Sequence, residues 1–151
     1  MKNNLKQQLY LLCMECIEQR ISNAQEAINV AKESANDDSK SSAGDKHETG
    51  RAMAQLEQEK SGQQLKEAEE LKKTLEKMNV GNTSDSIQIG SIVLTNKGNF
   101  FIAVPVGKLI VDKESYYAIS IGSPLGAKIK NLRNGTEFDM NGIVYKILGI
   151  L

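Results

Sequence analysis

The stretch IEQRISNAQEAINVAKESA, residues 17–35, has the most regular apolar pattern in the chain. Its apolar residues are spaced alternately four and three positions apart, and they are Ile17, Ile21, Ala24, Ile28, Ala31 and Ala35. A repeat of about 3.5 residues is typical of helices that pack together as a coiled coil. Further apolar residues continue the pattern toward the N-terminus with one slip in register, namely Leu5, Leu9, Leu12 and Cys16. We therefore expect a helix over about residues 5–35.

A second stretch of the same kind follows a loop-like segment, NDDSKSSAG, at residues 36–44. The apolar pattern resumes at Met53 and Leu56, weakens over residues 57–64, and recovers at Leu65, Ala68, Leu71, Leu75 and Met78. This predicts a second helix over residues 48–78. Two helices of equal length joined by one short loop predict an antiparallel coiled-coil hairpin. Each arm would be about 45 Å long at 1.5 Å per residue, which is too slim to enclose an active site.

The composition changes near Gly81. The following residues hold both prolines, six of the seven aromatic residues and clusters of Val and Ile separated by Gly and Asn. This is typical of strands and turns, and we expect strands at residues 91–95, 100–104, 107–111, 116–121 and 143–148. Asn96-Lys97-Gly98-Asn99 predicts a hairpin turn, and Ser123-Pro124 predicts the start of a short helix.

The predicted fold is therefore α+β and has two domains. Residues 1–80 form an N-terminal antiparallel α-helical coiled-coil hairpin, and residues 81–87 form a linker. Residues 88–151 form a small, mostly antiparallel sheet domain with one short helix.

Charge and cysteine content narrow the function classes. Nineteen basic residues balance nineteen acidic ones, which argues against a general nucleic-acid binder. Two cysteines cannot build a disulfide framework, as expected in a reducing compartment. The longest apolar run near the N-terminus, residues 9–14, is too short for a membrane span. We expect a cytoplasmic protein with no membrane partner.

Three candidate features have ordinary structural explanations. His47 is the single histidine, which excludes a metal site built on several histidines, and its potential nucleophile neighbours are only Ser39, Ser41 and Ser42. Cys13 and Cys16 have C-x-x-C spacing without a second ligand pair, so we expect buried or half-buried helix cysteines. The glycines of the second half match no phosphate loop or dinucleotide fingerprint.

Four carboxylates cluster at the predicted hairpin tip: Asp37, Asp38, Asp45 and Glu48. Acidic residues commonly occupy loops and the first turn of a helix, where they complement the helix dipole. Alternatively, oxygen ligands at the end of a thin hairpin could coordinate a hard cation such as Mg²⁺, although one or two carboxylates make an incomplete site. The residues themselves leave both interpretations open.

The chain resembles the bacterial Gre transcript-cleavage factors, GreA and GreB. Their tip reads Gly-Asp, two variable residues and then Glu-Asn, and the corresponding segment here is Gly44-Asp45-Lys46-His47-Glu48-Thr49. Their FKBP-like C-terminal domain carries further segments that match this chain, which are Ile89-Gly90-Ser91-Ile92-Val93, Ile119-Ser120, Ser123-Pro124-Leu125-Gly126, Gly135-Thr136-Glu137-Phe138 and the terminal Tyr145-Lys146-Ile147-Leu148-Gly149-Ile150.

This resemblance implies a transcription elongation factor that binds RNA polymerase through its secondary channel. Asp45 and Glu48 would help hold a Mg²⁺ ion shared with the polymerase, which then hydrolyses the 3′ end of backtracked nascent RNA. The chain would have no stand-alone active site, no small-molecule substrate and no cofactor of its own. Two-metal hydrolysis needs such a second ion, so the implied chemistry is self-consistent.

Two departures from the family pattern keep other functions open. Arg51 stands where the family often has an acidic residue, and Ala52 stands where it usually has an aromatic one. One alternative is a Gre-like regulator that enters the channel and inhibits polymerase without stimulating cleavage. A third possibility is a coiled-coil adaptor unrelated to transcription.

Overall fold

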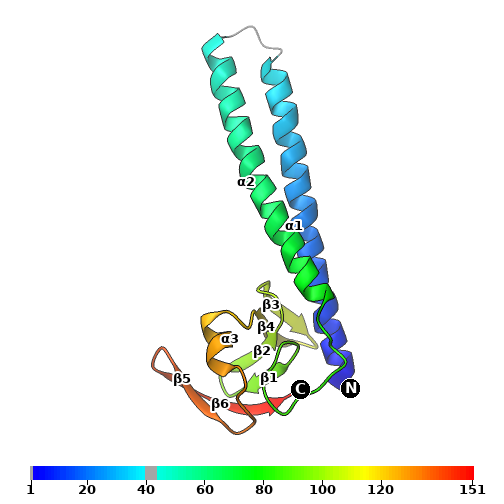
Figure 1. Cartoon of the computed structure of the whole chain (residues 1–151), viewed down its shortest axis with the longest axis vertical. Coiled ribbons are helices and arrows are strands. Elements are labelled where there is room, and N and C mark those ends of the chain that lie inside the picture. The colour runs from blue at the N-terminus through cyan, green and yellow to red at the C-terminus, as the bar shows by residue number, and fades with distance from the viewer. Residues whose placement is uncertain (1, 40–43) are drawn as a thin grey trace. The chain divides into compact units, whose positions relative to one another are not determined.

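The computed structural model describes the backbone of residues 2–39 and 44–151, and the side chains of residues 4–34 and 49–151. Two long helices, α1 (Lys2–Ser39) and α2 (Gly44–Glu76), lie side by side and run in opposite directions (Figure 1). Six strands and one short helix follow in the chain: β1 (Ile92–Thr95), β2 (Gly98–Ile102), β3 (Gly107–Val111), β4 (Glu114–Ile119), α3 (Pro124–Ile129), β5 (Glu137–Met140) and β6 (Ile143–Ile150). The predicted α+β fold class is confirmed.

The chain divides into two compact units. The hairpin unit comprises Ile17–Lys72, which contains most of α1 and α2. The sheet unit comprises Lys73–Leu151 together with Met1–Cys16, so it includes the first turns of α1. Neither long helix contains, within the residues that the structure describes, an apolar segment able to span a membrane.

The seam of the hairpin unit is built from small residues at heptad spacing. On α1 the buried positions are Ile17, Ala24 and Ala31, and on α2 they are Ala54, Ser61 and Ala68. Side chains of this size let two helix backbones approach closely, because little volume separates them. The predicted α1 seam is confirmed at Ile17, Ala24 and Ala31, while the side chain of Ala35 lies outside the described residues.

The predicted α2 seam is wrong in its first turns. Met53 and Leu56 are 66% and 65% exposed, while Ala54 between them is buried. The seam then continues through the polar stretch with half-buried Gln58 and buried Ser61. Alanine, serine and glutamine are hard to recognise as contact residues in a sequence. The prediction therefore followed the large apolar side chains nearby and placed the contact face one residue away from Ala54.

The helix boundaries also differ from prediction on either side of the loop. α1 continues to Ser39, so residues 36–39 are helical and not part of the loop, and α2 begins at Gly44 rather than at residue 48. Adding a residue to an existing helix costs little compared with nucleating one. Weak helix formers can therefore extend a long helix by a turn.

The sheet has the strand order β3-β4-β2-β1-β6-β5. Neighbouring strands are antiparallel except β2 and β4, which are parallel, so the mostly antiparallel sheet is confirmed. β3 lies at its predicted bounds and the other predicted strands are shifted by at most two residues at either end. β5 was not among the strands predicted from composition, although the family segment matched at residues 135–138 is a strand entry. Its sequence, EFDM, is short and acidic, and its Phe138 ring stacks on Tyr145 of β6 with centroids 5.0 Å apart.

One hydrophobic cluster forms part of the core of the sheet unit. Its buried members are Ile87, Val93, Phe100, Ile102, Ile129, Phe138 and Ile147. Ile87, at the end of the predicted linker, is fully buried there, and its backbone pairs with Leu132 and Asn131 through hydrogen bonds of 2.8 and 2.9 Å. α3 begins where predicted, with Ser123 as its N-cap and Pro124 in its first turn.

Candidate functional site

The sequence places the candidate site where the chain reverses between α1 and α2. Asp45 and Glu48 fall in the first turns of α2, since this helix begins at Gly44. Their side chains lie outside the described residues, as do those of Asp37, Asp38 and His47. The same holds for Ser39, Ser41 and Ser42. The geometry of the predicted metal ligands therefore stays a prediction.

The described side chains contain no alternative metal centre. Within residues 4–34 and 49–151, no group of three or more His, Cys, Asp or Glu side chains could hold a metal ion. On the α2 side, Arg51 and Ala52 are both exposed. Arg51 follows Glu48 by three positions, a spacing that brings two residues onto the same face of a helix.

A first hollow lies between the two helices within the hairpin unit. Ala24 and Ala68 are buried in it, and its sides include Arg20, Gln64 and Glu67. Its volume is about 370 Å³. The sides include Leu71 as well as polar side chains, and they carry charges of both signs.

A second hollow, of about 640 Å³, lies nearer the loop between the helices. We call it the Val30–Met53 groove. Its buried residues are Ala31 and Ala54, while Val30 and Met53 on its sides are 55% and 66% exposed. Two carboxylates, Glu26 and Glu57, also line it. This groove was not predicted, although Val30 lies outside the repeat of α1 and is a large apolar residue on a polar face.

Lys6 is the most unusual charged residue in the sheet unit. Its side chain is only 2% exposed, and its Nζ donates a hydrogen bond of 2.9 Å to the backbone carbonyl of Asn82. Burial lowers the pKa of Lys6 below its usual value. The hydrogen bond ties the first turns of α1 to the segment that follows α2.

The cysteines of α1 behave as structural residues. Cys13 is fully buried and Cys16 is half-buried, and both are free thiols. Desolvation, together with the neighbouring Cys16, raises the pKa of Cys13 to about 12. Because the thiolate is the nucleophile and the metal ligand, Cys13 is suited to neither role at neutral pH. The expected buried and half-buried positions are confirmed.

The Ser-Pro-Leu-Gly segment has a clear structural purpose. Ser123 Oγ donates to the Ser120 carbonyl at 2.7 Å and accepts from the Gly126 backbone N–H at 3.0 Å. A Cβ on Gly126 would collide with the Ser120 carbonyl oxygen and would lie 2.9 Å from the Ile121 Cα. The motif therefore caps α3 and lets the preceding backbone approach the helix.

Together these features define an α+β protein in which a long helical hairpin precedes a mixed six-stranded sheet. No protein-family model matches the sequence, and no curated protein matches it. The chain is similar to a solved structure described as that of the transcription factor Gfh1. The two are 19% identical, and the match covers 93% of this chain and 92% of the other, with a TM-score of 0.34.

Proposed function

We propose that this chain is a Gre-like transcription elongation factor that binds bacterial RNA polymerase through its secondary channel. The observation that carries the proposal is the Gly44-Asp45-x-x-Glu48 motif, which falls at the start of α2 where a two-helix hairpin reverses. The Ser123-Pro124-Leu125-Gly126 segment supports it at a second, distant position in the sequence.

The carboxylates of Asp45 and Glu48 would provide oxygen ligands for a Mg²⁺ ion shared with the polymerase. Two carboxylates suit a hard cation but leave its coordination incomplete, which agrees with a site that is completed by the partner. In two-metal hydrolysis the ions activate water and stabilise the leaving oxygen. This chain is then not an enzyme alone, and it approaches the nascent RNA 3′ end only within the complex.

The test is a cleavage assay on a halted, backtracked elongation complex with Mg²⁺. The intact chain should accelerate release of short 3′ RNA fragments. Loss of even an outer partner of a metal site costs about 10–100-fold, so the Asp45→Asn/Glu48→Gln double variant should lose at least that much stimulation. It should still co-elute with polymerase.

The matched control is the Asp37→Asn/Asp38→Asn double variant, which removes the same charge from the end of α1. It should retain most of the stimulation. Equal activity of the Asp45/Glu48 variant and the intact chain would contradict the proposed role of these carboxylates.

A second candidate function is a channel-binding regulator that does not stimulate cleavage. Arg51 favours it, because an exposed guanidinium three positions after Glu48 can pair with that carboxylate and compete with a metal ion. This function predicts co-elution with polymerase and slower transcription without added cleavage products. Absence of co-elution would instead favour the coiled-coil adaptor.

A further inference from the structure

The Val30–Met53 groove is an apolar surface that the described side chains of the hairpin leave uncovered. Its seam residues at this level are Ala31 and Ala54, with half-buried Gly50 beside them. None of these side chains is large enough to fill the space between two helices. The larger apolar side chains, Val30 and Met53, therefore stand at the sides of an open groove instead of closing over it.

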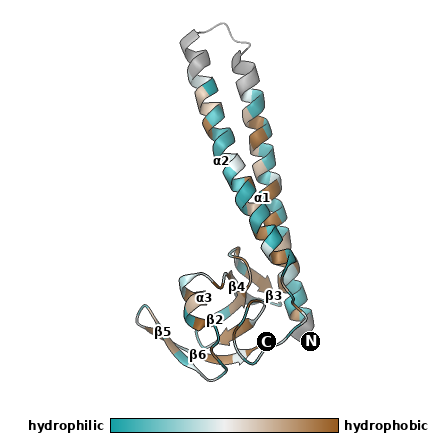
Figure 2. Cartoon of the chain, viewed as in Figure 1, coloured by the Kyte–Doolittle hydropathy of each residue, from teal (hydrophilic) through white to brown (hydrophobic). Residues whose placement is uncertain are grey.

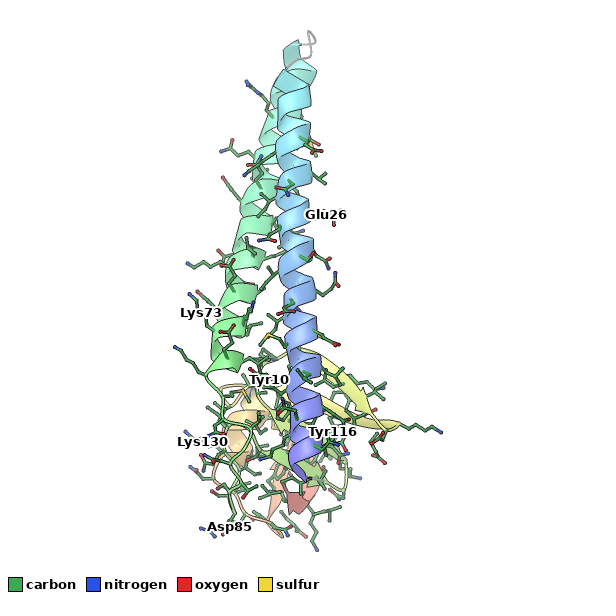
Figure 3. The ribbon with its side chains drawn as sticks, turned by 90° about the vertical axis from the view of Figure 1, so that its right-hand side faces the viewer. Tyr10, Glu26, Lys73, Asp85, Tyr116 and Lys130 are labelled. Carbon is green, nitrogen blue, oxygen red and sulfur yellow. The ribbon has the colours of Figure 1, made fainter. Side chains whose placement is uncertain are left out.

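The charges along this groove have one sign. Glu26 and Glu57 line it, and none of the described residues that line it is a lysine or arginine. Glu26 projects from α1 in Figure 3. The first hollow differs, because Arg20 and Glu67 there carry opposite charges. An apolar centre with an acidic margin is complementary to a partner with apolar residues between basic ones.

We propose that the Val30–Met53 groove binds an amphipathic helix of another protein. Apolar side chains of that helix would lie between Val30 and Met53, and flanking Lys or Arg side chains would pair with Glu26 and Glu57. A helix is the occupant that fits, because the groove runs between two helices packed side by side, and a third helix packs into such a groove through residues spaced three and four apart.

A second copy of this chain fits the groove less well. If two grooves faced each other across a two-fold axis, Glu26 and Glu57 of one copy would approach the same carboxylates of the other. Like charges placed together at an interface repel each other and disfavour the association. The inference uses the hairpin unit alone, so it holds or fails independently of the proposed polymerase function.

The probe is a fluorescently labelled helical peptide with Leu at every third or fourth position and Lys on both flanks. A matched peptide carries Glu in place of each Lys. Binding to the full chain is followed by fluorescence anisotropy at low and at physiological salt. The Lys peptide should bind saturably and more weakly as salt rises, and it should bind at least about tenfold more tightly than the Glu peptide.

Two matched variants distinguish binding in the groove from non-specific hydrophobic binding. Met53→Gln removes an apolar side of the groove, and Leu56→Gln changes an equally exposed residue of α2 that does not line it. Both residues are two-thirds exposed, so neither change should disturb folding, which circular dichroism checks. Met53→Gln should weaken the Lys peptide about tenfold or more, and Leu56→Gln less than about twofold.

A charge-reversal variant tests the role of the two carboxylates in the same binding experiment. The Glu26→Lys/Glu57→Lys variant should no longer bind the Lys peptide and should bind the Glu peptide instead. Non-saturable binding, equal affinity for both peptides, or equal effects of Met53→Gln and Leu56→Gln would each overturn the inference. A concentration-dependent dimer in sedimentation that Met53→Gln abolishes would also overturn it, since a second copy would then occupy the groove.

Discussion

The sheet unit and the hairpin unit are stabilised by different kinds of side chain. In the sheet unit Ile92, Phe101 and Ile102 are fully buried, whereas the hairpin seam buries mainly alanines and Ser61. Figure 2 shows the strands mostly in hydrophobic colours and the helices largely in hydrophilic ones. Each buried CH₂ group contributes about 0.8 kcal/mol, so large side chains stabilise the sheet unit far more per residue.

This difference indicates how one chain can combine a unit with a large apolar core and a helical hairpin with a small one. Small seam residues keep two helices close together, but they leave little apolar area to hold them. They also leave hollows on the hairpin surface, of which the Val30–Met53 groove is apolar. We expect the hairpin unit to open at lower free energy than the sheet unit, as regions with few buried apolar contacts do.

The largest predicted change in stability follows from truncating a core residue of the sheet unit. Phe101→Ala should lower the free energy of unfolding by about 3–5 kcal/mol, because it removes a fully buried ring and leaves a cavity. Ala68→Gly in the hairpin seam should cost only about 1 kcal/mol, mostly through helix propensity. Urea unfolding measures both, and similar losses for the two variants would contradict the comparison.

The next effect concerns the backbone around α3. Gly126→Ala should cost about 1–3 kcal/mol or more, because its Cβ meets the Ser120 carbonyl, and backbone cannot move aside as a side chain can. Gly122→Ala is the control, since nothing lies within 4 Å of a Cβ built there. Thermal unfolding of the pair should show a lower Tm for Gly126→Ala alone. A Tm equal to that of the parent protein would mean that the backbone around Ser120 shifts to accommodate the added Cβ.

These contrasts also explain what the sequence could predict. Ile17, Ala24 and Ala31 belong to a regular helical repeat. The β3 sequence contains a run of Leu, Ile and Val, so both features were found at the correct place. On α2, Ala54 and Ser61 form the seam, and such residues look like surface. Met53 and Leu56 were assigned to the seam wrongly. They were chosen because their side chains are large and apolar, but the position of a residue in the helical repeat decides whether it faces the other helix.

Other features depend on partners far away in the sequence. β5 is a strand because it pairs with β6 and because Phe138 stacks on Tyr145, and neither contact is visible in the sequence EFDM. The parallel pairing of β2 with β4 likewise joins strands that are not consecutive. For the candidate site, the sequence placed Asp45 in the turn and Glu48 at the start of the second helix, whereas both residues fall in α2. The geometry of these ligands stays a prediction.

A smaller effect sharpens the account of the hairpin seam. Ser61 is 1% exposed, and its hydroxyl has no hydrogen-bond partner among the described atoms. A buried polar group without a partner is costly, so Ser61→Ala should stabilise the protein by about 1 kcal/mol. Ser22→Ala on exposed α1 surface should gain only about 0.5 kcal/mol or less, from helix propensity. Equal gains in urea unfolding would show that Ser61 is already hydrated.

The smallest effect concerns Lys6 and pH. Burial lowers its pKa from the usual 10.5, so just below that value the unfolded chain binds more protons than the folded one, and this group's contribution to stability rises with pH. Lys6→Met keeps the apolar stem and removes the buried charge. At pH 7 the variant should be more stable than the parent by under about 1 kcal/mol, because the lost hydrogen bond to Asn82 offsets part of the gain.

The measurement is the difference in unfolding free energy between parent and Lys6→Met from pH 7 to 10.5. The difference is needed because Cys13 acts in the opposite direction. Its pKa is raised from 9.0 to about 12, so its contribution is lost as pH rises above 9, equally in both proteins. The gap between them should therefore narrow as Lys6 loses its proton in the folded state. A gap that stays constant would mean that Lys6 keeps its ordinary pKa, and that its ammonium remains as well solvated as in the unfolded chain.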